Sequence, residues 1–196
     1  MQLYNITKIV NLLKSGGILC IPTDTLFAIS CDATNETAIK KIYNIKKREL
    51  NKPFPIFFAD FDMANFYMNF CEKEIALAKK FWPGPLTILS KIKTKSLPEI
   101  LIKNNKLGVR IPNSKLIHDI CSSLKRPIIA TSANISKEEN INDISNIKTL
   151  FNNKIDSYIS GPTTPHATPS TIIEVQNNKI NIIREGAIKE EELKIK

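Results

Sequence analysis

Hydrophobic residues recur at helical spacing near the start of the chain and then give way to a short unbroken run. Apolar positions three and four residues apart predict an amphipathic helix over residues 3–15. Residues 18–21 are apolar at every position, which is typical of a buried strand. A second helix is expected after Thr34 or Asn35, since either side chain can cap it. Its predicted apolar face consists of Ala38, Ile39, Ile42 and Ile45.

The rest of the chain continues this mixture of short strands and helices. Further strands are predicted over residues 54–59, 86–91, 107–111, 127–130, 155–159, 171–175 and 180–184. Helices are predicted near 61–69, near 73–81 and from the capping residue Ser114 to Leu124, with loops over 48–53 and 136–146. Asn177-Asn178 predicts a hairpin turn between the last two strands. The pattern therefore indicates a single α/β domain over residues 1–196 with a mixed sheet.

Charge and composition narrow the classes of protein that the chain can belong to. Lys and Arg number 28 against 19 Asp and Glu, which gives a formal net charge of +9. The hydrophobic content of 42% is sufficient for a buried core. No apolar run reaches the roughly 18 residues that a membrane helix needs, and we find no export signal, so a cytoplasmic protein without a membrane contact is expected. The basic excess is densest over residues 40–52, where a nucleic acid partner is one reading and a solvated surface the other.

Histidines, cysteines and glycines are too sparse for several common sites. His118 and His166 lie far apart, and Cys20, Cys31, Cys71 and Cys121 include no CxxC pair. This argues against a zinc site of the usual spacing and against a disulfide framework. The six glycines form neither GxGxxG nor GxxxxGK[ST], which excludes the standard dinucleotide and P-loop fingerprints. We expect no metal site built from protein side chains.

Cations, hydroxyls and amides follow the predicted strands instead. Ligands of α/β sheets bind where loops leave the strand ends. Six loops are therefore candidates for a binding site: 22–33, 48–53, 110–114, 131–140, 160–170 and 184–186. They carry Thr23, Asp24, Thr25, Arg48, Lys52, Arg110, Thr131, Ser132, Asn134, Ser170, Thr171 and Arg184. This set lacks a nucleophile paired with a base, but it suits a ligand with several negative charges. Each member alone also has a structural reading: a surface ion pair, a turn, a cap or a solvated helix end.

The amino-acid sequences of seven segments, and their order along the chain, resemble those of a known family. The segments are Gly16–Thr25, Tyr43–Pro53, Phe81–Thr87, Gly108–Pro112, Ala130–Asn134, Pro169–Ile172 and Ile183–Gly186. Together they resemble the YrdC family of threonylcarbamoyl-AMP synthases, in its short form. The resemblance implies a twisted mixed sheet with flanking helices and a concave basic face. It also implies that the chain joins L-threonine, bicarbonate or CO2 and ATP into threonylcarbamoyl-AMP and pyrophosphate, for threonylcarbamoyl modification of adenosine 37 in tRNA.

The same resemblance assigns roles to individual residues. The nucleotide is expected to contact Arg48, Lys52, Ser132, Asn134 and Arg184, and the threonine substrate Thr25, Arg110 and Ser170. No catalytic side chain is expected, because the carbamate of threonine is itself the nucleophile. Mg²⁺ is expected on the phosphate oxygens, and downstream proteins are expected to transfer the threonylcarbamoyl group. A direct contact with tRNA is left open.

The chain departs from the family pattern at three places. Residues 26–30 contain no glycine, Phe57 stands where some relatives have histidine, and Lys137 replaces the usual glycine after Ser136. We therefore assign no role to residues 137–143, Asn140 included. A second hypothesis is a non-catalytic RNA-binding protein that uses the basic concave face. A third is a relative of the same fold acting on a sugar phosphate, although the site loops carry no acidic cluster to hold metal for it.

Overall fold

The computed structural model describes residues 4–136, 138–139, 141, 143–161 and 168–194. The helices of this part of the chain are α1 (Ile6–Lys14), α2 (Glu36–Ile45), α3 (Phe61–Tyr67), α4 (Glu72–Phe81), α5 (Lys115–Leu124) and α6 (Ile144–Phe151), with 3-10 turns at Glu99–Leu101 and Glu190–Leu193. The strands are β1 (Leu19–Ile21), β2 (Ala28–Ser30), β3 (Ile56–Phe57), β4 (Met68–Asn69), β5 (Leu86–Ile92), β6 (Lys106–Arg110), β7 (Ile128–Ile129), β8 (Thr131–Ser132), β9 (Ser157–Tyr158), β10 (Thr171–Gln176) and β11 (Lys179–Arg184).

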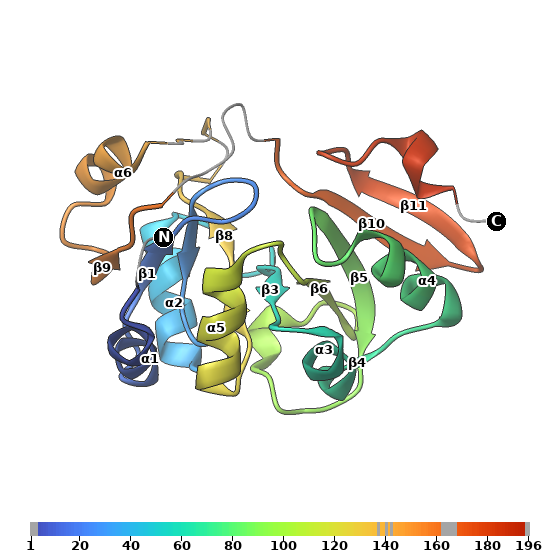
Figure 1. Ribbon diagram of the computed structural model, residues 1–196, viewed down its shortest axis with the longest axis horizontal. Coiled ribbons are helices and arrows are strands. Elements are labelled where there is room, and N and C mark those ends of the chain that lie inside the picture. The colour runs from blue at the N-terminus through green and yellow to red at the C-terminus, as the bar shows by residue number, and fades with distance from the viewer. Residues whose placement is uncertain (1–3, 137, 140, 142, 162–167, 195–196) are drawn as a thin grey trace.

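These strands form two mixed sheets. The described strands of the smaller sheet run in the order β8-β2-β1-β9, and those of the larger sheet in the order β11-β10-β5-β6-β3-β7, with β4 paired to β5. In Figure 1, β1, β8 and β9 lie toward one end of the long axis and β5, β10 and β11 toward the other, with β3 and β6 between them. Parallel and antiparallel pairs occur in both sheets, which confirms the predicted α/β class with a mixed sheet. No helix in the described ranges is long and apolar enough to cross a bilayer.

The strand β1 is buried on both faces, as its unbroken apolar run predicts. Cys20 packs into one core cluster, where it meets α2 residues such as Ile39 and Ile42. Its neighbours Leu19 and Ile21 point to the opposite face and join a second cluster with α1 and α5. Because both faces are covered, the end of β1 is held rigidly, and the loop after it starts from a defined position.

Most of the predicted elements agree with the structure within a few residues. Asn35 rather than Thr34 caps α2 by accepting from the Ala38 amide at 3.0 Å, and Ser114 caps α5. The buried face of α2 includes Tyr43, whereas Ile45 is only half-buried. Asn177 and Asn178 both have positive φ, at 48° and 60°, as a tight hairpin turn between β10 and β11 requires.

Three predictions of loop are wrong. The expected loop over 131–140 begins with Thr131–Ser132, which form β8 and pair antiparallel with β2. Residues 22–33 were expected as one loop, but Ala28–Ser30 form β2, which pairs antiparallel with β1. The expected loop over 136–146 ends early, because Asp143 caps α6 by accepting from the Asn146 amide at 2.8 Å. Within that loop, residues 137, 140 and 142 lie outside the described ranges. All three misses involve short elements that neighbouring strands or a cap stabilise, rather than a long periodic pattern.

Strand register brings distant segments of the chain to one place. Ser132 on β8 pairs with Ala28 on β2, next to the loop that follows β1. Arg110 on β6 pairs with Phe57 on β3, and Arg184 on β11 pairs with Ile172 on β10. Pairing between strands within each sheet, not proximity in sequence, therefore brings the candidate site residues into place.

Candidate active site

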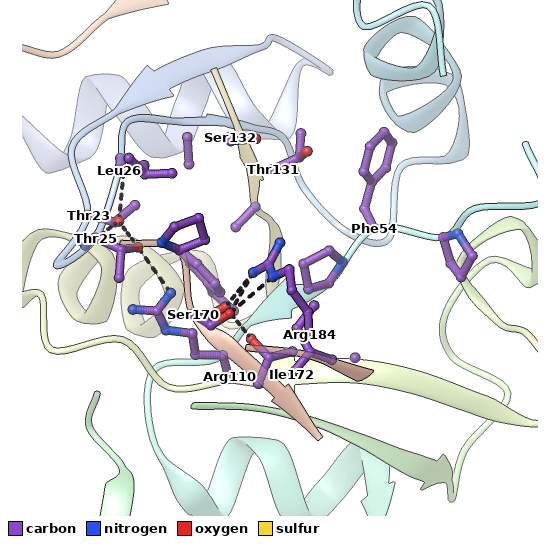
Figure 2. A pocket seen from close by; sticks show the side chains of 18 of the residues that line it. Thr23, Thr25, Leu26, Phe54, Arg110, Thr131, Ser132, Ser170, Ile172 and Arg184 are labelled. Atoms are coloured by element: carbon purple, nitrogen blue, oxygen red, sulfur yellow. Dashed lines mark hydrogen bonds between the residues drawn. The ribbon is translucent and has the colours of Figure 1, made fainter. Parts of the chain in front are cut away.

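A cavity of about 460 Å³ is lined by residues from both sheets. Among its lining residues are all the sequence-predicted site residues except Lys52: Thr25, Arg48, Arg110, Ser132, Asn134, Ser170 and Arg184. Figure 2 shows several of them converging on one space from different strands. Of the described residues that line the cavity, the charged ones are all arginines. A cavity of this kind attracts ligands that carry several negative charges.

Arg110 is buried at one side of the cavity, where protein groups hold it in place. Its Nε donates to the Gly84 carbonyl oxygen at 2.9 Å, and its Nη2 donates to Asp24 Oδ1 at 2.5 Å. Its Nη1 donates to the Thr25 hydroxyl at 3.2 Å, and its guanidinium lies 5.3 Å from the centre of the Phe57 ring. These bonds use three of the five N–H donors of an arginine, which leaves two for a ligand.

Asp24 keeps this buried cation charged. Burial lowers the pKa of the Arg110 guanidinium, and the adjacent Asp24 carboxylate opposes that shift. Asp24 is itself held by the Asn113 amide, which donates to its Oδ2 at 2.9 Å. The pair gives Arg110 a fixed orientation, which is what recognition of a planar carboxylate requires.

Arg184 and Ser170 form a second hydrogen-bonded unit in the cavity. The Arg184 Nη2 donates to the Ser170 carbonyl oxygen at 2.7 Å and to its hydroxyl at 3.2 Å (Figure 2). The Ser170 hydroxyl also lies 2.9 Å from that of Thr87 on β5. Desolvation, followed by repulsion from Arg110 and Arg48, lowers the pKa of Arg184. The cations of the cavity therefore repel one another, and an anionic ligand relieves that repulsion.

Arg48 and Lys52 occupy different positions although both belong to the loop after α2. Arg48 donates from Nε to the Lys52 carbonyl oxygen at 2.7 Å, and its guanidinium lies 5.0 Å from the centre of the Phe54 ring. The Lys52 ammonium instead contacts Glu49 at 2.7 Å, with the Lys52 side chain 46% exposed. Arg48 lines the cavity, whereas Lys52 is not among the lining residues.

Ser132 and Asn134 are held by a buried lysine. The Ser132 hydroxyl donates to Asn134 Oδ1 at 2.6 Å, and Asn134 Nδ2 donates to the Glu138 carbonyl oxygen at 2.6 Å. Lys46 Nζ donates to the backbone carbonyls of Ser132 and Asn134 and to Asn134 Oδ1. Lys46 is 1% exposed, and burial lowers its pKa to about 7. The reading of the basic stretch 40–52 as a solvated surface is therefore wrong for Lys46.

The comparison with known proteins agrees with the seven segments found in the sequence. Residues 11–186 match the family described as "Telomere recombination", that of Sua5, YciO and YrdC. The chain belongs to this family. The resemblance to YrdC proteins is thereby confirmed, and the family match covers every element from α1 to β11 except the first residues of α1.

Relatives of the Sua5/YciO/YrdC family match over most of this chain. The threonylcarbamoyl-AMP synthase of Wigglesworthia glossinidia brevipalpis is 36% identical and aligns with 95% of this chain and 96% of its own length. A protein of Methanocaldococcus jannaschii is 38% identical over 92% of this chain and 87% of its own. The crystal structure of P. abyssi Sua5 complexed with L-threonine has a TM-score of 0.89 at 28% identity and matches 96% of this chain. E. coli YciO has a TM-score of 0.84 at 25% identity, with 93% and 89% of the two chains covered. The chain spans only 56% of the P. abyssi Sua5 chain.

Sequence reasoning missed two polar side chains that hold the site. Lys46 follows Ile39, Ile42 and Tyr43 at helical spacing on the buried face of α2, so the periodicity carried a signal that its charge obscured. Thr87 lies inside the apolar run of β5 and is 1% exposed, and nothing in the local pattern distinguishes it. The departure at Phe57 also has a structural meaning, because its ring packs against the Arg110 guanidinium.

Protein side chains offer no metal cage in the part of the chain that the structure describes. It contains no group of three or more His, Cys, Asp or Glu able to hold a metal ion. His118 is exposed beside Asp119, and His166 falls outside the described residues. Cys20, Cys31 and Cys121 are buried free thiols, and Cys71 is an exposed one.

Proposed function

We propose that this chain is an L-threonylcarbamoyladenylate synthase. The reaction joins L-threonine, bicarbonate and ATP into threonylcarbamoyl-AMP, with pyrophosphate and water as the other products. The relatives named threonylcarbamoyl-AMP synthase and Sua5 support this assignment. The observation that carries it is the cavity itself, where Arg48, Arg110 and Arg184 gather with serine and threonine hydroxyls and where no described residue of the lining is a carboxylate.

The cavity suits a reaction in which the substrate supplies the nucleophile. The threonine amine captures CO2 as a carbamate, and a carbamate oxygen attacks the α-phosphorus of ATP while pyrophosphate leaves. Both reactants are anions, so the protein must hold them together against their mutual repulsion. Fixed guanidinium groups perform that task without a catalytic nucleophile or base, which agrees with the composition of the lining.

The residues of the cavity divide into two sets, one for each substrate. We assign the threonine carboxylate to Arg110, with Thr25 and Ser170 beside it. The nucleotide is assigned to Arg48, Ser132, Asn134 and Arg184, and Lys52 would reach the triphosphate from the rim, where its backbone carbonyl already binds Arg48. ATP is expected to enter as its Mg²⁺ complex, with phosphate and water among the ligands of the ion, since the described lining residues offer hydroxyls but no carboxylate.

The product is an activated threonylcarbamoyl group, and its destination follows from the family. We propose that downstream proteins transfer it to adenosine 37 of tRNA, with tRNA contact by this chain left open. ATP and tRNA are cytoplasmic, so the cytoplasm is the proposed location. We also propose that residues 1–196 act as one domain, because one core cluster contains residues of both sheets, such as Ile29 and Val109.

Pyrophosphate release tests the proposal. Purified protein with Mg²⁺, ATP, L-threonine and bicarbonate should release pyrophosphate, and omission of threonine or bicarbonate should stop the release. Arg48→Ala should abolish it, whereas Lys40→Ala, a matched change at an exposed residue paired with Glu36, should not. Release that is indifferent to threonine contradicts the proposal. Tight RNA binding without any turnover would favour the RNA-binding hypothesis instead.

A further inference from the structure

The hydroxyl of Thr23 lies at the centre of a small hydrogen-bonded corner beside the cavity. Its oxygen is 2.7 Å from the Leu26 carbonyl oxygen, 3.0 Å from the Thr25 amide nitrogen and 3.0 Å from the Thr25 hydroxyl oxygen. Figure 2 shows this corner continuing from Leu26 through Thr23 and Thr25 to Arg110. Thr23 and Thr25 are 6% and 7% exposed, so the corner is largely removed from bulk water.

The partners of Thr23 determine where its proton lies. A carbonyl oxygen can only accept, so the single hydroxyl proton of Thr23 is donated to Leu26. An amide nitrogen can only donate, so the Thr25 amide occupies one lone pair of the Thr23 oxygen. The remaining contact joins two hydroxyl oxygens, and one of them must donate. Because the proton of Thr23 is already used, Thr25 is the donor.

This arrangement of protons determines whether the Thr25 hydroxyl can donate or accept a hydrogen bond toward the cavity. Its only hydroxyl proton points to Thr23 and away from any ligand. One lone pair of its oxygen accepts from Arg110 Nη1 at 3.2 Å, which leaves a second lone pair at the cavity lining. Thr25 can therefore accept a hydrogen bond from a ligand but cannot donate one. Arg110, directly beside it, has only donors to offer.

We propose that Thr23 is a positioning residue that makes the cavity selective for a ligand with a hydrogen-bond donor beside an anionic group. The inference rests on the proposed function for the identity of that ligand, which is L-threonine. Its carboxylate would bind the free N–H groups of Arg110, and an N–H or O–H of the same molecule would donate to Thr25. A carboxylate or phosphate oxygen placed against Thr25 would meet a lone pair instead, which is repulsive.

Two isosteric variants separate this role from a structural one. Thr23→Val removes the hydroxyl and keeps the shape, whereas Thr23→Ser keeps the hydroxyl and removes a methyl group. Titration calorimetry in degassed, bicarbonate-free buffer would measure L-threonine and ATP binding without turnover. We expect Thr23→Val to weaken threonine binding about tenfold and ATP binding by less than about twofold, as for loss of one well-oriented hydrogen bond. Thr23→Ser should restore threonine affinity to within about threefold of the wild type.

A double variant makes the test independent of any general loss of stability. Thr25→Val removes the acceptor itself, so adding Thr23→Val to it should change threonine affinity by less than about twofold, a non-additive result expected of residues that act through one another. Equal threonine affinity in the wild type and Thr23→Val overturns the inference, as does an equal loss for threonine and ATP. A wild-type protein that binds no threonine would overturn the proposed function as well, which distinguishes the two failures.

Discussion

Lys46 Nζ lies 2.6 Å from the backbone carbonyl oxygen of Asn134, although the two residues are 88 positions apart in the sequence. The ammonium group is buried and its contacts are oxygens of the Ser132–Asn134 segment. A helix of the first core cluster is thereby joined to the loop that carries the proposed nucleotide contacts. Burial of the Lys46 ammonium is unfavourable because the group loses its contact with water. Its hydrogen bonds in turn hold the Ser132–Asn134 segment in place without a ligand.

This burial predicts that stability depends on the titration of Lys46. The pKa of lysine is 10.5 in the unfolded chain and about 7 in the folded protein, so the unfolded state binds more protons between these values. The free energy of unfolding of the wild type should therefore rise relative to Lys46→Met by roughly 2 kcal/mol between pH 6.5 and pH 9. Urea denaturation at the two pH values measures this difference. Lys41→Met, at an exposed position of α2, should show no such change, and a pH-independent difference for Lys46→Met would contradict the assignment.

Arg110 and Arg48 should act on different substrates. Arg110→Lys keeps the charge beside Asp24 but loses the planar fork, so we expect threonine affinity to fall about tenfold and ATP affinity by less than about twofold. Arg48→Lys should show the opposite preference. Titration calorimetry with each substrate provides the comparison. If both variants lose threonine and ATP affinity equally, the assignment of Arg110 to threonine and of Arg48 to ATP is wrong.

Lys52 is predicted to contribute less than Arg48 to ATP binding. Its ammonium is paired with Glu49 at the surface, so moving it to a phosphate requires breaking that ion pair, and exposed charges are well screened. Lys52→Ala should weaken ATP binding by a factor of about three, compared with tenfold or more for Arg48→Ala. An unchanged dissociation constant for ATP in Lys52→Ala would remove Lys52 from the site.

Gly186 is predicted to be essential for the position of Ser170. A Cβ atom at residue 186 would lie 2.2 Å from the Pro169 carbonyl oxygen and 2.5 Å from the Ser170 carbonyl carbon. Both are backbone atoms, so Gly186→Ala must displace the segment that carries Ser170, immediately before β10. We expect a loss of about 2 kcal/mol in the free energy of unfolding and a larger loss of threonine than of ATP affinity. Glu185→Ala, an exposed neighbour, is the control, and wild-type stability in Gly186→Ala would mean that the two segments are not so closely packed.

Local sequence patterns were sufficient for elements whose environment is encoded by their own residues. The unbroken apolar run of β1 predicts a strand covered on both faces, and Asn177-Asn178 predicts the hairpin turn, because asparagine tolerates the positive φ that the turn needs. The loops expected to bear the site supply much of its lining, from Thr25 to Arg184, whereas Thr87 and Leu89 of β5 come from outside them. These features depend on neighbours in the chain or on the general tendency of polar loops to follow buried strands.

Tertiary structure alone decided the features that depend on partners far away in the chain. The three residues of β2 form a strand because β1 and β8 flank them, and their own side chains show no strand pattern. Lys46 is buried and Lys52 is exposed, although both belong to one basic stretch, because only Lys46 faces the core from α2. The polarity of Thr25 is likewise set by the Leu26 carbonyl and the Arg110 guanidinium, whose positions the backbone fold determines. A charge or a hydroxyl has a fixed role only when its partners are in place, and those partners come from other strands.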